Sequence, residues 1–576
     1  MPGLTVLFDG RLSNKVELAE RLGLPSQSNA AETYGAAIAR WDIRADHRAI
    51  GVYAAIGRTR EGNVRLSRSP WNAPPLFWAR WEGCWLVASI PRPIFAGGLP
   101  KRLKPNAIAE ALYGIENPEG GYWWEQLNAV PHGSVVTLQS NGGDPMIDRW
   151  YDPLALPDIS LPNDEAYVDQ ANALLTEGVG HALREAGRPG ILLSGGLDSA
   201  IVADEMLRQL PSNHRLSSFT FVPAKGSPLH EPPGMFGDER ASVEAFARMH
   251  PRLDAHFVET EWYEQKLDRH FLAADTGRPS LAVSAVYDAP LAMAAKAGCD
   301  TVFEAGLGNA TFSQHAPWAY IEFSKSARWR ELWLLARDHP GDARPIWRRL
   351  FSRCVIPLLP EPLRDALRTA VHGPVPSLNR QASLIRPEMH EELRLDDLAR
   401  SLGDLRRDEG VMSKEEWLRG VWRASDIGAE HHYAAEQMHG VRLADPTAYR
   451  PLIEYCLGLP TDQFVRDGEQ RWLARRMARG RMPEAQRTNP LYARHNSDWH
   501  SRMSGRLLTI RAAFDTMEQD EELRRLIDLE RGRAMLLKWS DGPPDDVRDA
   551  RAVFNGLNGA IIAARFHRYA TGSNTI

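Results

Sequence analysis

Two patterns of apolar residues divide the chain into a first part of short strands and a longer part in which strands alternate with helices. Residues 4–152 carry short apolar runs separated by turns, which is typical of a layered β structure. We expect strands at 4–8, 49–56, 63–67, 75–81, 84–89 and 134–138, and an amphipathic helix at 15–24. Six tryptophans of this part are expected to form core or interface: Trp71, Trp78, Trp81, Trp85, Trp123 and Trp124.

The second pattern begins after a proline-rich, polar segment at 153–162, which we interpret as a linker. Asn163 can cap a helix whose apolar residues recur every three or four positions up to Leu183. Buried apolar runs at 191–193, 216–222 and 255–259 then alternate with helical runs at 197–207 and 238–247. This alternation predicts a parallel sheet with right-handed crossovers, whose ligands bind at the carboxyl ends of the strands.

Residues 320–480 are rich in Leu, Arg, Ala and Trp at helical spacing and predict a mainly helical cap. The tail beyond residue 503 is also expected to be helical. The predicted fold class is therefore α/β: a β-rich sandwich domain over residues 1–152, the linker 153–162, and a parallel-sheet domain with helical additions over residues 163–576.

One loop of the parallel-sheet part carries candidate chemistry. Ser194, Gly195 and Gly196 follow a strand, and Leu197, Asp198 and Ser199 open the next helix. A glycine turn at a helix N-terminus presents free backbone N–H groups and the positive end of the helix dipole, so it favours anions. The loop lacks the lysine of a Walker motif. The alternative is a tight turn that only packs, but such a turn needs one glycine rather than two flanked by hydroxyls and a carboxylate.

Composition excludes several classes of partner. The net charge of −5 and a pI near 6.4 give no general attraction to nucleic acid. Cys84, Cys299, Cys354 and Cys456 lie far apart, which argues against a zinc site or a disulfide framework and suits a reducing cytoplasm. The sequence holds no apolar run of about 18 residues and no signal peptide. We therefore expect a cytoplasmic protein with neither a nucleic acid nor a membrane as partner.

The loop Ser194 to Ser199 resembles the pyrophosphate loop of the ATP pyrophosphatase superfamily, whose enzymes split ATP between the α and β phosphates to adenylate a substrate. The resemblance implies that the loop binds the pyrophosphate of ATP and that Asp198 binds Mg²⁺. It also places adenine at the end of the second strand, against Phe221 and Val222. Plain core is the alternative interpretation of these two residues.

Residues 302–313 resemble the second nucleotide motif of asparagine synthetase-like enzymes, which adds Glu304 and Ala305 to the nucleotide site. Asn309 stands where the family has a magnesium-binding aspartate, and an amide oxygen can still bind the cation. Gly306 stands where asparagine synthetase has its catalytic glutamate and β-lactam synthetase a tyrosine. The general base is therefore open between Glu304, His315 and groups beside the pyrophosphate loop.

Two further features concern charge at the site. The family uses a lysine to neutralise the phosphates, but this chain has none between Lys414 and Lys538, so the role is expected to fall to an arginine such as Arg487 or Arg494. A cluster at 430–439 contains three histidines, but its spacing is not that of a HExxH metal motif. We interpret it as a solvated helix face, with a metal site as the alternative.

Residues 8–18 and 67–78 resemble class II glutamine amidotransferase domains, and the segments at 130–133 and 150–153 resemble the end of that domain in asparagine synthetases. The resemblance implies an Ntn-type sandwich that is degenerate. Its nucleophile should be a cysteine exposed by removal of Met1, but residue 2 is Pro2 and no cysteine precedes Cys84. The segment before residue 8 is also shorter than in the family, so we expect an abbreviated domain, or a recorded start too far downstream, and no glutaminase activity.

Loss of that nucleophile beside an intact pyrophosphate loop resembles the macrocyclases of lasso peptide biosynthesis. The implied reaction uses ATP and Mg²⁺ to adenylate an Asp or Glu side chain of a linear, leader-processed core peptide, whose N-terminal amine then closes a macrolactam. A leader peptidase and precursor-recognition proteins would be partners in this antibiotic (RiPP) biosynthesis. The alternatives are a ligase of the asparagine synthetase or β-lactam synthetase type that uses ammonia or a small amine, and a non-catalytic scaffold of the same fold.

Overall fold

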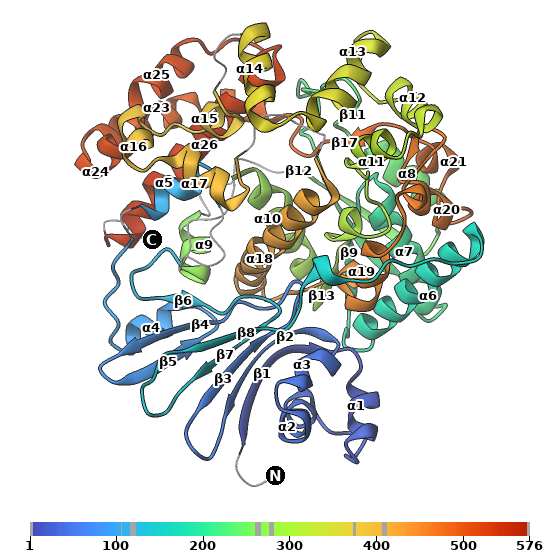
Figure 1. Ribbon diagram of the computed structural model, residues 1–576, viewed down its shortest axis with the longest axis vertical. Helices are drawn as coiled ribbons and strands as arrows, with labels where there is room; N and C mark the ends of the chain where they lie inside the picture. The colour runs from blue at the N-terminus through green and yellow to red at the C-terminus, as the bar shows by residue number, and fades with distance from the viewer. Residues whose placement is uncertain are drawn as a thin grey trace.

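The computed structural model describes residues 4–104, 106–115, 122–259, 267–275, 281–372, 376–405 and 412–572. Its N-terminal part contains two antiparallel sheets (Figure 1). The larger sheet has the strand order β1 (Thr5–Leu12), β2 (Gly51–Arg58), β3 (Val64–Arg68), β7 (Ser134–Leu138) and β8 (Met146–Arg149). The smaller has the order β5 (Cys84–Ala88), β4 (Phe77–Trp81) and β6 (Asn128–Ala129). We call these two sheets the sandwich.

The two sheets share an apolar interior that includes Leu66, Val136 and Leu138, with Trp78 and Trp85 packed against it. Helices α1 (Lys15–Arg21), α2 (Ala30–Trp41) and α3 (Arg44–Arg48) contribute to the core on the outer face of the larger sheet. Helices α4 (Pro91–Ala96) and α5 (Ala107–Leu112) pack beside the smaller one. The layer order is therefore helix, sheet, sheet, helix, which confirms the predicted β-rich sandwich.

The end of the chain completes the last layer. Helices α23 (Leu507–Glu518) and α26 (Val547–Ala570) lie in one apolar core with Phe77, Trp123 and Trp124. The rings of Trp123 and Phe566 are 4.8 Å apart. Trp71, Trp123 and Trp124 are buried, as expected of core tryptophans. Segments more than 400 positions apart in the sequence thus share one hydrophobic core.

The second part of the chain contains a five-stranded parallel sheet. Its order is β12 (Leu253–Glu259), β10 (Leu216–Val222), β9 (Pro189–Leu192), β13 (Thr301–Phe303) and β14 (Arg442–Ala444). Helices α6 (Asp164–Leu183), α7 (Leu197–Gln209) and α8 (Arg240–Met249) share the core on one face. Helices α10 (Leu281–Lys296) and α18 (Lys414–His439) cover the other face and lie in the centre of Figure 1. The α/β prediction is confirmed.

Strand β9 has β10 on one side and β13 on the other, so the chain changes direction across the sheet at this strand. In open parallel sheets such a switch point opens a crevice at the carboxyl ends of the strands. The register pairs Phe303 with Ile191 of β9 and with Ala444 of β14. The segments that follow these three strands therefore emerge side by side at one edge.

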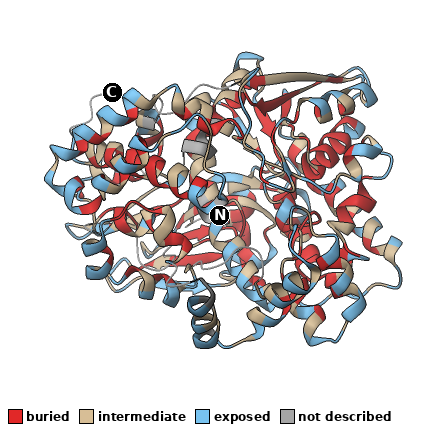
Figure 2. Ribbon diagram, turned by 90° about the horizontal axis from the view of Figure 1, so that it is seen from above, coloured by how far each residue is buried: buried red, intermediate tan, exposed pale blue. Residues whose placement is uncertain are grey.

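Helical additions surround this core, as predicted for residues 320–480 and for the tail. They are α9 (Leu267–Ala274), α11 (Ala319–Lys325), α12 (Trp329–Arg337), α13 (Ile346–Leu350), α14 (Glu361–His372), α15 (Leu378–Ala382), α16 (Pro387–Glu392), α17 (Leu395–Leu402), α19 (Arg450–Leu457), α20 (Trp472–Met477), α21 (Glu484–Arg487), α22 (Trp499–Ser504), α24 (Glu521–Leu526) and α25 (Leu529–Leu537). Short strands β11 (Met235–Phe236) and β17 (Tyr492–Ala493) pair with each other, as do β15 (Val465–Arg466) and β16 (Glu469–Gln470). Figure 2 shows the buried residues on the strands and on the inner faces of the helices. Within the described ranges, the longest apolar stretches of helix fall short of a membrane span.

Candidate functional site

The loop between β9 and α7 is held in shape by its own serines. The backbone N–H of Ser194 donates to the Ser199 hydroxyl at 3.0 Å, and that of Gly196 donates to the Ser194 hydroxyl at 3.2 Å. From outside the loop, the Gln486 amide donates to the carbonyls of Gly195 and Gly196, at 3.3 and 3.2 Å. The predicted anion loop is thus a rigid turn at a helix N-terminus, the position that favours phosphate.

Asp198 lies directly behind this loop, with a relative exposure of 8%. Its Oδ1 atom is buried and has no hydrogen-bond partner among the described residues. Burial raises the pKa of the carboxyl group, while the positive charge of Arg471 and the Ser313 hydroxyl oppose the rise. A buried carboxylate oxygen without a partner is costly unless a cation or donor satisfies it, so this residue fits the predicted role of magnesium ligand.

The segment after β13 approaches Asp198 closely. A Cβ atom on Gly308 would stand 2.7 Å from Asp198 Cβ, so only glycine allows this distance. The next residue, Asn309, is exposed, and its side-chain oxygen accepts a hydrogen bond from Arg471 Nη2 at 2.7 Å. The structure thus brings the two predicted metal ligands, Asp198 and Asn309, to the same edge of the sheet; metal binding itself stays a prediction.

Arg471 is the residue that sequence reasoning missed. It precedes α20 with a backbone φ of 58°, and its Nε donates to His315 Nε2 at 3.2 Å. Burial and the charges of Arg471 and Arg475 hold the pKa of His315 well below its ordinary value, so this imidazole is a neutral acceptor. The signal in the sequence was only that three arginines fall within 471–476, and nothing distinguishes Arg471 from the other two.

The arginine named from the sequence lies elsewhere. Arg487 forms a bidentate ion pair with Glu484 on the same short helix and donates to the carbonyl of Arg475 at 3.2 Å. The backbone N–H of Arg494 donates to the carbonyl of Phe236 at 2.8 Å. A phosphate contact for Arg487 stays a prediction, whereas Arg471 already contacts Asn309.

The predicted adenine residues end strand β10. Val222 is 1% and Phe221 8% exposed, so their burial also fits the alternative that both residues belong to the hydrophobic core. The guanidinium of Arg502 lies 5.5 Å from the Phe221 ring centroid and pairs with Asp498 at 2.9 Å. Leu197 is buried in the core at the start of α7. The adenine contact stays a prediction.

Two carboxyl groups follow the paired ends of β13 and β14, those of the buried Glu304 and the half-buried Asp445. Burial raises the pKa of Glu304 to about 7. Burial, together with the charge of Glu304, raises the pKa of Asp445 to about 7. Asp445 is fixed by the backbone N–H groups of Leu307 and Thr447, at 2.9 and 2.8 Å. Ala305, the other nucleotide residue expected in this segment, is half-buried.

The histidine cluster of α18 is not a solvated helix face, and that prediction was wrong. His432 Nδ1 lies 3.4 Å from Glu304 Oε1. The His431 ring stacks on His270 of α9 at 5.3 Å, and burial holds its pKa well below the ordinary value. The helix packs against α9 and α10, which covers the face that the sequence left open. Within the described ranges no three His, Cys, Asp or Glu side chains are arranged to bind a metal.

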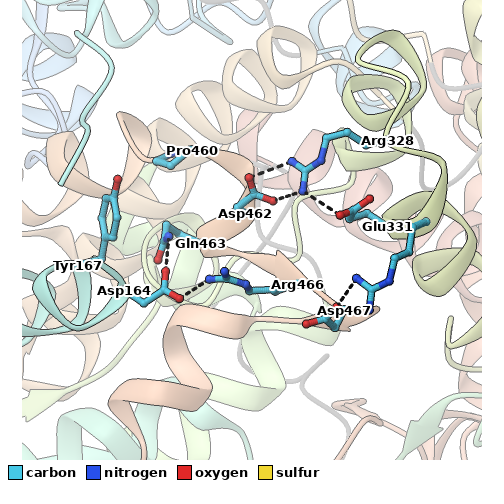
Figure 3. A pocket seen from close by; sticks show the side chains of 10 residues that line it. Asp164, Tyr167, Arg328, Glu331, Pro460, Asp462, Gln463, Arg466 and Asp467 are labelled. Atoms are coloured by element: carbon cyan, nitrogen blue, oxygen red, sulfur yellow. Dashed lines mark hydrogen bonds and ion pairs between the residues drawn. The ribbon is translucent and has the colours of Figure 1, made fainter. Parts of the chain in front are cut away.

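A separate cavity of about 450 Å³ lies between α6, α12 and the segment 460–467 (Figure 3). Its charged side chains point toward one another rather than into the space. Arg328 pairs with Asp462 at 2.6 Å, Arg330 with Asp467 at 2.9 Å, and Arg466 with Asp164. Because these charges neutralise each other, the described residues that line the cavity leave no unpaired charge in it.

A family model described as asparagine synthase matches residues 170–564, more than half of the chain. Proteins of Mycobacterium bovis and Mycobacterium tuberculosis that carry the name asparagine synthetase (glutamine-hydrolyzing) are 25% identical over 226 residues, or 37% of this chain. The match spans about a third of the length of these curated relatives (34%).

Solved structures with some similarity include glutamine phosphoribosylpyrophosphate amidotransferase from B. subtilis complexed with ADP and GMP. It aligns with a TM-score of 0.22 at 13% identity, over 44% of this chain and 71% of that chain. The allosteric regulatory enzyme of purine biosynthesis aligns with a TM-score of 0.21 at 12% identity, over 45% of this chain and 70% of that chain.

Proposed function

Because the chain belongs to the asparagine synthase family, we propose that it is an ATP-dependent ligase that closes a macrolactam ring in a linear peptide. An Asp or Glu side chain of a leader-processed peptide is adenylated, and the N-terminal amine of the same peptide attacks it. The products are the cyclic peptide, AMP and pyrophosphate. The observation that carries adenylation is the rigid Ser-Gly-Gly loop with the unpartnered oxygen of Asp198 behind it.

In the first step, the peptide carboxylate attacks the α-phosphorus of ATP and pyrophosphate leaves. The loop and the N-terminus of α7 stabilise the charge that develops on pyrophosphate. Arg471, held by Asn309 and His315, adds a positive charge next to the loop. Asp198 and Asn309 would hold Mg²⁺, which supplies further charge neutralisation on the phosphates.

The proposal of a peptide substrate goes with the expectation that the sandwich does not release ammonia from glutamine. Within residues 4–152 the sequence holds one cysteine, Cys84, which is exposed where β5 begins after a turn. Pro2, on which the expected loss of glutaminase activity rested, lies outside the described residues. We propose that the attacking amine belongs to the substrate itself, so that the reaction needs no ammonia from glutamine.

Cyclisation of an adenylated peptide depends chiefly on position. Holding the amine against the acyl-adenylate makes the attack intramolecular, which is worth several kcal/mol of barrier. Water must be excluded because it hydrolyses the adenylate. The role of the protein in this step is to shape the space around the peptide.

Pyrophosphate release tests the adenylation step. Purified protein with Mg-ATP is offered synthetic peptides that have a free N-terminus and one Asp or Glu, moved one position at a time. We expect pyrophosphate and AMP in equal amounts, with a product lighter than the peptide by one water, for one narrow set of positions. Asp198→Ala should lower both signals at least 100-fold, because it removes the unpartnered carboxylate.

Asp254→Asn serves as the matched control, since Asp254 pairs with Arg215 on the surface. The second candidate is a ligase that uses ammonia or a small amine. Conversion of aspartate with ammonia, together with no pyrophosphate from any peptide, would favour that candidate. If neither condition gives pyrophosphate, and wild type and Asp198→Ala cannot be distinguished, the result would favour a non-catalytic scaffold.

A further inference from the structure

Glu304, which forms a carboxyl pair with Asp445 at the ends of β13 and β14, lacks the contacts expected of a residue that only supports the fold. The parallel register pairs Phe303 with Ala444, so Glu304 and Asp445 leave adjacent strands at the same height. Glu304 is 3% exposed, and the donors that face it among the described residues are the Tyr287 hydroxyl and His432 Nδ1 at 3.4 Å, neither of which meets full hydrogen-bond geometry. A buried carboxyl group without firm donors is unfavourable for folding alone.

Gly306 has no side chain, which leaves space beside Glu304 and Asp445. The residue is exposed, and a Cβ atom placed on it would lie 3.4 Å from Glu304 Oε1 and 3.3 Å from Asp445 Oδ2. Two residues further on, Gly308 touches Asp198. Two residues of chain span at most about 7 Å, so the backbone beside the carboxyl pair lies within that distance of the backbone that approaches Asp198.

The groups around the pair keep it able to exchange a proton. Burial lowers the pKa of His432, and the charge of Glu304 keeps the pKa of Tyr287 well above its ordinary value, so both neighbours are neutral. Arg11 from β1 adds a positive charge near Asp445, and Glu436 of α18 a negative one near His432. Beside Asp445 lies a cavity of about 30 Å³, enough for one water.

We propose that Glu304 is the proton acceptor for the attacking amine and that Asp445 is its positioning residue. The inference rests on the proposed function. The ammonium group gives one proton to Glu304, the neutral nitrogen forms the C–N bond, and the acyl C–O bond to AMP breaks with its electron pair on the phosphate oxygen. Glu304 passes this first proton to water through Asp445 and, ionised again, accepts the second proton that the nitrogen loses as the amide forms.

A general base has the greatest effect when its pKa lies near the working pH, as these carboxyl groups provide. Asp445 is held by three donors, the N–H groups of Leu307 and Thr447 and the Thr447 hydroxyl, so it stays in place while Glu304 exchanges the proton. The charge of one carboxylate disfavours ionisation of the other, and the pair titrates as a unit.

The test compares two amines on the same adenylate. Wild type, Glu304→Gln, Glu304→Asp and the control Glu205→Gln receive Mg-ATP and the peptide library, with or without hydroxylamine, which is largely unprotonated at neutral pH and needs no base. Glu205 is buried and bonded to Thr176, Gln209 and Arg481, away from the loop. We expect Glu304→Gln to lower macrolactam formation at least 100-fold more than it lowers hydroxamate and pyrophosphate formation. Glu304→Asp should recover part of that loss.

The effect of Asp445→Asn is measured as the pH dependence of macrolactam formation. Removing the neighbouring charge lowers the pKa of Glu304, so the midpoint of macrolactam formation should move to lower pH while hydroxamate formation stays flat. Equal macrolactam formation by Glu304→Gln and wild type, or an equal loss of macrolactam and hydroxamate, would overturn this inference and leave the proposed function standing. If the unchanged protein releases no pyrophosphate with any peptide, the proposed function and this inference fall together.

Discussion

At the scale of single residues, Glu304 makes the stability of the protein depend on pH. Its folded-state pKa of about 7 is above the ordinary 4.5, so the fold favours the protonated form. The stabilisation is fully present below pH 4.5 and is lost as the pH rises through about 7. Glu304→Gln lacks this titration, so its advantage over wild type should be on the order of 1–3 kcal/mol at alkaline pH and absent at acidic pH.

Urea unfolding of both proteins at about pH 5 and about pH 9 measures this difference. Glu205→Gln is again the control, because hydrogen bonds lower the pKa of Glu205 and its substitution should be destabilising at neutral pH. A constant difference between Glu304→Gln and wild type across this range would contradict the raised pKa.

Gly308→Ala tests the close approach of the two loops. The added methyl would stand 2.7 Å from Asp198 Cβ, so one loop must shift. We expect adenylation, measured as pyrophosphate release, to fall at least 10-fold. Gly420→Ala is the matched control: it lies within α18 with nothing within 4 Å of the new methyl, and should gain about 0.5–1 kcal/mol from helix propensity. Equal activity of both variants would contradict the steric argument.

The sequence predicted those site residues whose role depends on a local motif. Ser194 to Ser199 could be recognised because strand, turn and helix follow one another without interruption. Arg471 could not, because its contact with Asn309 joins positions 162 residues apart and depends on a left-handed turn. The pairing of Glu304 with Asp445 likewise depends on the register of two strands that lie far apart in the sequence.

At the scale of elements, apolar runs located most strands, but they did not reveal elements built mainly of polar or small residues. Strands 134–138 and 216–222 were predicted to the residue. Helix α2 was missed although Asn29 and Glu32 form a capping box, because its interior is mostly alanine, glycine and polar residues. Strand β8 was missed because all four of its side chains are exposed.

Helix α18 links the sandwich to the parallel sheet, and Trp422 is one of the side chains that make this contact. The Trp422 ring stacks on His132 at 3.7 Å and contacts Trp71 at 4.7 Å and Tyr151 at 5.5 Å. Ten residues later, the same helix presents His432 to Glu304. Periodicity alone could not reveal that the histidine face is covered, because it does not say which segments pack against a helix.

Trp422→Ala should therefore affect both stability and the site. We expect a loss of about 2–4 kcal/mol from the large-to-small change, and a weaker effect on pyrophosphate release than on macrolactam formation. Trp347→Ala is the control, because that indole is 62% exposed on α13. Thermal unfolding measures the loss of stability, and the pyrophosphate and macrolactam assays measure the effect on the site. Equal melting temperatures for the two variants would contradict the packing role of Trp422.

At the scale of the whole molecule, the two parts unfold as one if the shared core is as continuous as its contacts indicate. Phe566 touches Trp123, Trp124 and Phe271 within 6 Å between ring centroids. We expect Phe566→Ala to cost about 3–5 kcal/mol and to make the sandwich more sensitive to limited proteolysis. The exposed Trp329→Ala should change neither. Two separate calorimetric transitions in the wild type would contradict a single cooperative unit.

The shared core also sets an order of events during synthesis. The sandwich is translated before α26, yet one apolar face of its smaller sheet is covered by that helix. Until α26 is made, Phe77, Trp123 and Trp124 lack their final partners, and exposed apolar surface of this kind favours aggregation. The smaller sheet of the sandwich therefore reaches its final packing only after α26 has been synthesised.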